Sequence, residues 1–111
     1  MLRAGALEVR PGEFSAWAGG TFLQLSRREL ALLAELMRTN GRPVTRDELF
    51  ASVWGAELRP GDRSVDVYVH KLRAKLAKAM PEWAFIHTHF SYGYRFSPER
   101  TAPGNEPVTT S

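Results

Sequence analysis

The segment from Arg63 to Lys78 constrains the fold more strongly than any other part of the sequence. Its apolar side chains recur at i, i+4, i+7 and i+11, which are Val65, Val69, Leu72 and Leu76. This spacing places them in one stripe along an α-helix. We therefore expect a helix over this segment, in a domain that covers its apolar stripe.

The opposite side of this helix is basic and small near its middle. It carries Arg63, Val67, His70, Ala74 and Lys78, with Lys71 beside them and Arg73 and Lys75 toward the flanks. A small side chain at Ala74 lets the backbone approach a polyanion closely, and the surrounding cations attract one. The pattern indicates a DNA-recognition helix, although a solvated surface helix with ordinary basic decoration would look the same.

The distribution of charge also favours a polyanionic partner. The chain has 111 residues and a formal net charge of +3, and residues 1–62 are balanced. Residues 63–96 contain six basic and two acidic side chains, so the excess lies in this segment. Such an asymmetry is expected when one surface meets phosphates and the rest needs only to be soluble.

Length and composition limit the class of protein. The chain is long enough for one domain with one core, and it has no cysteine, which excludes disulfides and thiolate metal sites. No run of about 18 apolar residues could span a membrane, and the first residues lack the apolar centre of a signal peptide. We expect a cytoplasmic protein that contacts no membrane. No carboxylate pair, activated nucleophile or phosphate-binding glycine loop is evident, so neither an enzyme nor a cofactor is expected.

Short strands are expected before the first helix. Leu7 and Val9 alternate with polar neighbours, Pro11-Gly12 breaks the run, and residues 14–17 and 21–25 are further candidate strands. We predict a small antiparallel sheet within residues 6–25.

Capping boxes mark the starts of the first two helices, at Ser26-Arg-Arg-Glu29 and Thr45-Arg-Asp-Glu48. The first helix should end at Asn40-Gly41 and the second at Gly55, because these residues tolerate the left-handed conformation of a helix end. Pro43-Val44 is expected to be a brief extended link. Residues 55–62 form a loop, and Met80-Pro81 ends the third helix.

The C-terminal part has the pattern of a β-hairpin and a tail. Two aromatic and β-branched runs, residues 83–90 and 92–96, are joined at Phe90-Ser91. From Pro98 onward the segment has little to bury, so we expect a disordered tail over residues 98–111. The folded domain is then residues 1–97.

This order of sheet, helix, helix, loop, helix and hairpin is that of a winged helix-turn-helix, which is an α+β fold. From Leu30 to Phe96 the sequence resembles the effector domain of OmpR/PhoB-type response regulators. The matching residues are Glu29-Leu30, Leu33, Asn40-Gly41, Val44 to Leu49 with Arg46, Val53-Trp54-Gly55, Val65-Asp66-Val67, Leu72-Arg73, Leu76, Ile86, Thr88 and Gly93 to Phe96. The resemblance implies a four-stranded sheet before the first helix and a C-terminal hairpin that serves as the wing.

In this family the third helix lies in the major groove of DNA, the wing reaches the minor groove, and the loop before the third helix can touch RNA polymerase. The resemblance implies DNA contacts by Trp54, Arg63, Ser64, Val67, Tyr68, His70, Lys71, Arg73, Thr88, Phe90 and Tyr94. Arg63 and Ser64 match phosphate-contacting positions. The groove-facing positions are matched by Val67, Tyr68, His70 and Lys71, of which Val67 could meet a thymine methyl and His70 or Lys71 could donate to guanine.

Four residues call for a separate assignment. Arg73 could reach a phosphate, which we favour, or pair with an acid while its stem packs along the helix. Trp54 and Tyr94 could pack in the core and the wing, although the family also uses both positions to donate to the DNA backbone. Asp66 should be repelled by DNA, so we expect it to pair internally, with Arg95 of the hairpin.

The wing departs from the family pattern. Where the family usually has Thr-Val-Arg-Gly, this chain has Thr88-His89-Phe90-Ser91, so the arginine that would enter the minor groove is missing. Phe90 could press against sugars or wedge a base step, His87 or His89 could supply the contact when protonated, or the wing could contribute little. We expect weakened minor-groove recognition with a smaller salt dependence than in relatives. His87 and His89 share a strand face, but without a third ligand no metal site is expected.

Two functions remain open. The first is a sequence-specific, double-stranded-DNA-binding transcription regulator, either the effector domain of a response regulator or a stand-alone relative. For an effector domain, the resemblance implies dimers on tandem half-sites about one helical turn apart. The second is a protein-interaction winged helix that binds RNA polymerase or another regulator, which the unusual wing motivates.

Overall fold

Four short antiparallel strands open the computed structural model, which describes residues 1–101. They are arranged in the order β1 (Leu2–Ala4), β2 (Leu7–Arg10), β3 (Ser15–Ala18) and β4 (Thr21–Leu23). Leu7 and Val9 point into the core and are fully buried, as their alternation predicts. The small antiparallel sheet expected within residues 6–25 is confirmed, and β1 adds a strand before it.

The link between β2 and β3 differs from the prediction. A short 3-10 helix, η1 (Pro11–Glu13), follows β2, and Phe14 ends it with a φ of 50°. Because this left-handed backbone cannot continue a strand, β3 begins at Ser15 and the Phe14 ring is exposed.

Three helices follow the sheet: α1 (Arg27–Met37), α2 (Arg46–Trp54) and α3 (Ser64–Ala79). The capping box of α1 is complete, since Ser26 Oγ accepts from the Glu29 amide at 3.1 Å and Glu29 Oε1 accepts from the Ser26 amide at 2.7 Å. The capping box predicted for α2 is only half formed. Thr45 Oγ1 accepts from the Glu48 amide at 3.1 Å, but the Glu48 carboxylate pairs with Arg42 at 3.4 Å instead of returning to the cap.

The helix ends agree with the predictions at α2 and α3 and differ at α1. Gly55 ends α2 with a left-handed φ of 73°, and Met80 follows α3. Helix α1 ends at Met37, and Asn40 and Gly41, which have φ values of 54° and 83°, lie within the turn that follows it. The two left-handed residues therefore redirect the chain after the helix rather than terminate it directly.

The C-terminal hairpin is part of a three-stranded sheet with the order β5-β7-β6, formed by β5 (Val44–Thr45), β7 (Gly93–Arg100) and β6 (Trp83–His89). The link expected at Pro43-Val44 is thus a short strand. Strand β7 also continues past Pro98, because Glu99 and Arg100 pair with Ala84 and Trp83. The expectation of a disordered tail is wrong for residues 98–100, and its remainder from residue 102 lies outside the described residues.

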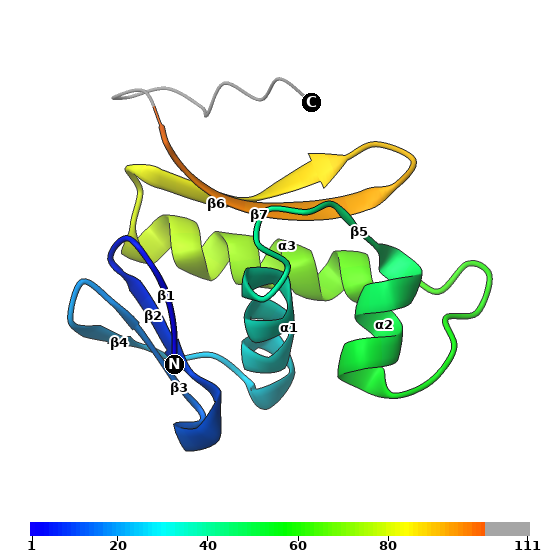
Figure 1. The fold of residues 1–111 in the computed structure, drawn as a ribbon, viewed down its shortest axis with the longest axis horizontal. Coiled ribbons are helices and arrows are strands. Elements are labelled where there is room, and N and C mark those ends of the chain that lie inside the picture. Colours follow the sequence, from blue (N-terminus) through cyan, green and yellow to red (C-terminus); the bar gives the residue numbers. More distant parts are fainter. Residues whose placement is uncertain (102–111) are drawn as a thin grey trace.

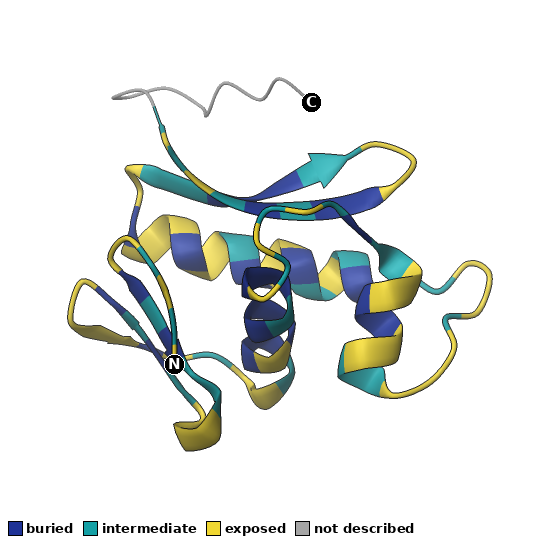
Figure 2. Ribbon diagram, viewed as in Figure 1, coloured by how far each residue is buried: buried dark blue, intermediate teal, exposed yellow. Residues whose placement is uncertain are grey.

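The core lies where α1 and α3 meet the two sheets. Figure 1 shows α3 running along the wing sheet, with α1 and α2 beside it and the N-terminal sheet near its C-terminal end. The predicted stripe of α3 is buried, as are most residues of α1, whereas the outer side of α3 is exposed (Figure 2). None of the described helices is long and apolar enough to cross a lipid bilayer.

Candidate nucleic-acid interface

The outer face of α3 presents the predicted groove-facing side chains to solvent. Val67 is 46% exposed, and His70, Lys71 and Ala74 are also exposed. Tyr68 is half-buried, because its ring packs edge-on against Trp54 with 5.5 Å between centroids. Lys71 Nζ lies 5.0 Å from the centre of the Tyr68 ring. Helix α3 therefore offers a small apolar group and a cation side by side, with an aromatic ring at the edge.

The first turn of α3 is fixed by Asp62. Asp62 Oδ1 accepts from the Ser64 amide at 2.8 Å and from the Ser64 hydroxyl at 2.6 Å, and these bonds lower the pKa of Asp62 below its ordinary value. The Ser64 hydroxyl is thus engaged with a carboxylate. The neighbouring side chain of Arg63 is 79% exposed and lies 3.6 Å from Asp66 Oδ2.

Asp66 has other partners than the one predicted. Its Oδ1 accepts from Arg46 Nε of α2 at 2.7 Å and from the Tyr94 hydroxyl of β7. Arg95 is instead bonded to His89 and Glu99, at 3.3 Å each. The prediction was wrong because neighbouring residues of a strand face opposite sides: Tyr94 points toward the helices, so Arg95 points away from them.

This cluster ties three elements together at the start of α3. Burial alone would raise the pKa of Asp66, but the hydrogen bonds from Tyr94 and Arg46 and the charges of Arg46 and Arg63 outweigh it and lower that pKa. Burial and the bond to Asp66 raise the pKa of Tyr94. Asp66 is therefore held ionised, and the Tyr94 hydroxyl is already a donor within the protein. Arg46 belongs to the matched family residues, but no local signal in the sequence pointed to its partner 20 residues away.

Arg73 and Thr88 are brought together beneath the wing. Arg73 Nη2 donates to Thr88 Oγ1 at 2.9 Å and Nη1 to the Ile86 carbonyl at 3.4 Å, while the guanidinium lies 5.4 Å from the centre of the Tyr94 ring. The acidic partner considered for Arg73 is replaced by these neutral acceptors. The side chain is half-buried and links α3 to β6.

Trp54 packs as an aromatic spacer between helices. Its ring stacks on Phe50 with 4.9 Å between centroids, and the Arg28 guanidinium lies 4.7 Å from its centre. The ring is half-buried, which agrees with a packing role with an accessible edge.

Lys75 was predicted to lie on the flank of the basic surface, but its charge is engaged within the protein. Its Nζ donates to Glu29 Oε1 at 2.7 Å and to the Gln24 carbonyl at 3.1 Å. Glu29 is only 3% exposed, and its bonds to Lys75 and Ser26 outweigh burial and lower its pKa. Lys75 therefore joins α3 to the start of α1, a contact that spans 46 residues and has no local sequence signal.

The tip of the wing is apolar and exposed. Phe90 is 78% exposed and Tyr92 48% exposed, on a turn closed by the Tyr92 amide and the His89 carbonyl at 3.0 Å. His87 is buried, and its Nε2 lies 2.8 Å from the Ser97 carbonyl. His89 Nε2 accepts from Arg95 at 3.3 Å, so each histidine already has a partner inside the wing.

Comparisons with known proteins agree with this arrangement. The sequence matches the family described as "Transcriptional regulatory protein, C terminal" over residues 20–96. It is 37% identical over 95 residues to the transcriptional regulatory protein CreB of Escherichia coli, covering 85% of this chain and 41% of CreB. It is 34% identical over 93 residues to BasR of the same organism, covering 84% of this chain and 40% of BasR. The chain thus spans about two fifths of the length of these relatives.

Solved structures with this architecture include DNA-binding domains. The DNA-binding domain of E. coli CpxR has a TM-score of 0.78 and 32% identity, covering 86% of this chain and 93% of that one. That of Klebsiella pneumoniae RstA, solved in complex with the RstA box, has a TM-score of 0.79 and 33% identity, covering 88% and 97%. The winged helix-turn-helix predicted from the order of elements is confirmed.

Proposed function

The chain belongs to the family of C-terminal domains of transcriptional regulatory proteins, as its resemblance to OmpR/PhoB-type regulators predicted, and from this premise we propose that it reads DNA sequence with α3 in the major groove. The observation that carries the proposal is the outer face of α3. It exposes Val67, His70 and Lys71 around the small Ala74, while the opposite stripe is locked into the core. A helix held in this way can enter the groove without rearrangement.

We assign base recognition to the middle of this face. Val67 meets a thymine methyl, and His70 and Lys71 donate to guanine O6 or N7, each well-formed contact discriminating by about 1–3 kcal/mol. Tyr68 borders the same groove with the edge of its ring.

Phosphate contacts surround this central group. Arg63 is the strongest candidate, because its side chain is 79% exposed at the start of α3. Ser64, Arg73 and Thr88 also lie around this group. The Ser64 hydroxyl is bonded to Asp62, and Arg73 is bonded to Thr88. We therefore propose that these three residues position the helix and the wing as well as contacting the DNA backbone. Trp54 and Tyr94 complete the assigned set, Tyr94 chiefly through its bond to Asp66.

The loop over residues 55–62 is proposed to contact RNA polymerase. Most of its positions are exposed, and Leu58 is the one apolar side chain of the loop that packs against the core. We propose that the chain is either the effector domain of a response regulator or a stand-alone relative, and that as an effector domain it binds as a dimer to tandem half-sites. Its proposed location is the cytoplasm, which holds the chromosome in the bacteria that carry these relatives.

Selection of bound sequences from random duplex DNA tests the proposal. We expect a recovered motif, and retention that is salt-sensitive but without a motif would support the alternative of a protein-interaction module. The double variant Arg63→Ala with Lys71→Ala should weaken binding to the recovered duplex by at least about tenfold. The matched control, Arg3→Ala with Arg42→Ala, removes two exposed cations elsewhere and should change affinity little. Equal losses in both variants would contradict the assignment to α3.

The wing is proposed to contribute little charge-based recognition of the minor groove. In Phe90→Arg, an arginine returns to the tip, where a narrow groove has enhanced negative potential. The slope of log K, the association constant for DNA, against the logarithm of the salt concentration should become steeper by about one. An unchanged slope would count against this view of the wing.

A further inference from the structure

The wing tip exposes two aromatic side chains, Phe90 and Tyr92, that could bind a partner. Among the large apolar side chains of the described residues, Phe90 is the most exposed, at 78%, and Tyr92 lies two residues away. Residues 88–92 contain no lysine or arginine. Because His89 Nε2 already accepts a hydrogen bond from Arg95, a contact made by this tip draws chiefly on apolar surface and neutral polar groups.

The tip is firmly supported at its base. Thr88 is bonded to Arg73 of α3, and the turn is closed by the bond between Tyr92 and His89. On the other strand, Gly93 packs so closely on β5 that a Cβ atom there would lie 1.9 Å from the Val44 carbonyl oxygen. The Phe90 ring is thus presented on a braced ribbon, which reduces the loss of conformational freedom on binding.

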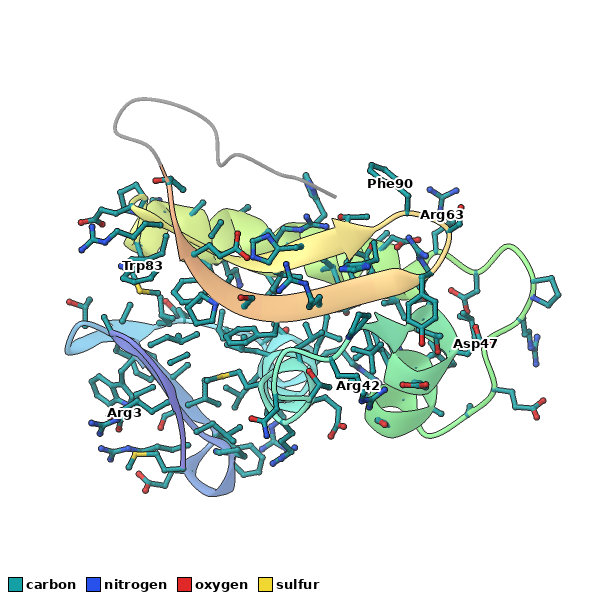
Figure 3. All side chains as sticks on the ribbon, turned by 45° about the horizontal axis from the view of Figure 1, so that its top comes forward. Arg3, Arg42, Asp47, Arg63, Trp83 and Phe90 are labelled. Carbon is teal, nitrogen blue, oxygen red and sulfur yellow. The ribbon has the colours of Figure 1, made fainter. Side chains whose placement is uncertain are left out.

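The tip also lies at the end of the molecule where α3 begins. Figure 1 shows the turn of the hairpin over this end, and Figure 3 shows the labelled side chains of Phe90 and Arg63 projecting there. Arg63 is the proposed phosphate contact at the edge of the major groove. With α3 in the major groove as proposed, a side chain at the tip of this hairpin is placed to meet the adjoining minor groove of the same duplex.

We propose that Phe90 is an apolar wedge that enters this minor groove at a pyrimidine–purine step, with Tyr92 packed on the neighbouring sugars. The inference rests on the proposed function and adds to it a second, indirect source of sequence preference. Apolar wedges partly unstack a base step, and TA and CA/TG steps unstack most easily while A-tracts resist. The wing would then select deformable DNA beside the site that α3 reads, without a hydrogen bond to any base.

The test uses the duplex recovered by selection, with 2-aminopurine placed in the step beneath the wing. Wild-type protein should increase 2-aminopurine fluorescence, because the base is unstacked. It should also bind a duplex with TA at this step about 5- to 50-fold more tightly than one with an A-tract there. Phe90→Ala should abolish both effects and keep the motif read by α3, and Phe90→Leu should retain part of both.

Phe22→Ala is the matched control, since Phe22 is also an exposed phenylalanine, at 53%, but lies on the N-terminal sheet. It should behave as wild type, and circular dichroism should show all variants folded. Retention of the fluorescence increase and the TA preference by Phe90→Ala would overturn the wedge alone. Failure of the wild type to select any motif would overturn the proposed function, and the wedge with it.

Discussion

Asp66 is the one acidic residue of α3, and its position explains how an acid can belong to a surface that we propose to bind phosphates. Its carboxylate turns inward, toward Arg46 of α2 and the Tyr94 hydroxyl of β7. The three groups lie at the junction of α2, α3 and the wing. Asp66 is therefore a positioning residue, which fixes the angle of α3 without touching DNA in the proposed complex.

The low pKa of Asp66 predicts how stability depends on pH. Its ordinary pKa is 3.8 and its folded pKa is lower, so its contribution is complete above the ordinary value and is lost as pH falls through the folded one. Asp66→Asn should lower the free energy of unfolding by about 1–3 kcal/mol at neutral pH, because Arg46 loses its ionic partner. The variant should also lose less stability than wild type on acidification below about pH 4.

Urea denaturation at several pH values checks this expectation. Glu57→Gln, in the exposed loop before α3, provides the control and should follow the wild-type profile. A parallel loss of stability on acidification in Asp66→Asn and wild type would show that Asp66 does not carry the effect.

Ser91 offers a second prediction at the scale of one residue. It occupies the wing turn with a φ of 65°, a left-handed conformation that a side chain disfavours. Ser91→Gly should therefore stabilise the domain by about 0.5–1 kcal/mol, measured by thermal or chemical denaturation. Ser97→Gly, within β7, should have the opposite sign, because glycine weakens a strand. Destabilisation by both variants would refute the strain assigned to the turn.

At the scale of elements, the two-residue strand β5 anchors the wing. Val44 and Thr45 pair with Tyr94 and Gly93, and only a glycine fits opposite them. Gly93→Ala should cost about 2 kcal/mol or more, since its Cβ would overlap the Val44 carbonyl oxygen.

Chemical denaturation of Gly93→Ala, compared with Gly12→Ala, isolates this close contact. Gly12 has no positive φ and no atom within 4 Å of an added Cβ, so its variant should stay within about 0.5 kcal/mol of wild type. Similar stabilities for the two variants would mean that β5 can yield, and that the wing is less firmly held than the geometry indicates.

The elements that were predictable from sequence are those with strong local signals. The periodicity of α3, the capping box at Ser26 and the left-handed Gly55 each define structure within a few residues. Strands β1 and β5 escaped the residue-level reading. Strand β1 pairs with the adjacent β2 but has only three residues, whereas the two-residue β5 pairs with β7, a segment far away in the sequence. The same reason applies to the polar contacts of the candidate site. Arg46 with Asp66 and Lys75 with Glu29 are 20 and 46 residues apart, so the fold alone brings them together.

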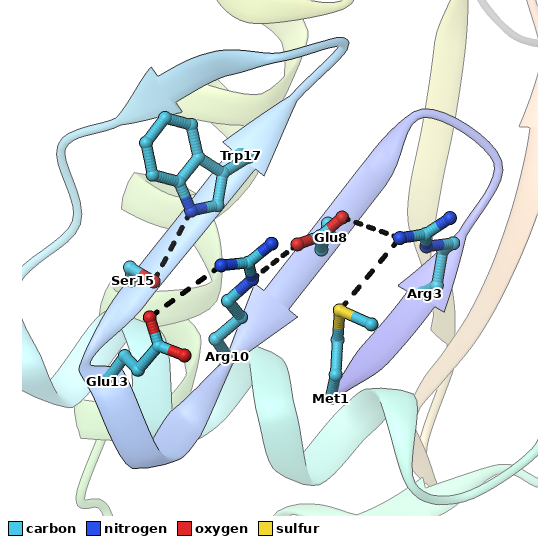
Figure 4. A network of polar contacts seen from close by, with 7 residues as sticks. All are labelled: Met1, Arg3, Glu8, Arg10, Glu13, Ser15 and Trp17. Atoms are coloured by element: carbon cyan, nitrogen blue, oxygen red, sulfur yellow. Dashed lines mark hydrogen bonds and ion pairs between the residues drawn. The ribbon is translucent and has the colours of Figure 1, made fainter.

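At the scale of the whole molecule, basic side chains differ in whether an acidic side chain lies close enough to neutralise them. On the outer face of the N-terminal sheet, Glu8 pairs with both Arg3 and Arg10, and Arg10 also approaches Glu13 at 3.7 Å (Figure 4). On α3, by contrast, Lys71 has no acidic partner among residues 1–101. Together with the excess of basic side chains in residues 63–96, this exposed cation favours approach of DNA to α3.

This arrangement predicts which cations govern the salt dependence of binding. Arg63→Ala should make the slope of log K against log salt shallower by about one unit, because this side chain, 79% exposed although 3.6 Å from Asp66, is the proposed phosphate contact, and the release of one counterion is lost with it. Lys75→Ala removes the same charge, but from a cation already paired with buried Glu29, so its slope should equal that of wild type while its unfolding becomes easier. Fluorescence anisotropy of a labelled duplex across a salt series, well below the melting temperature of each variant, measures both slopes. A shallower slope for Lys75→Ala than for Arg63→Ala would place DNA on the other side of α3, against the face that the fold leaves exposed.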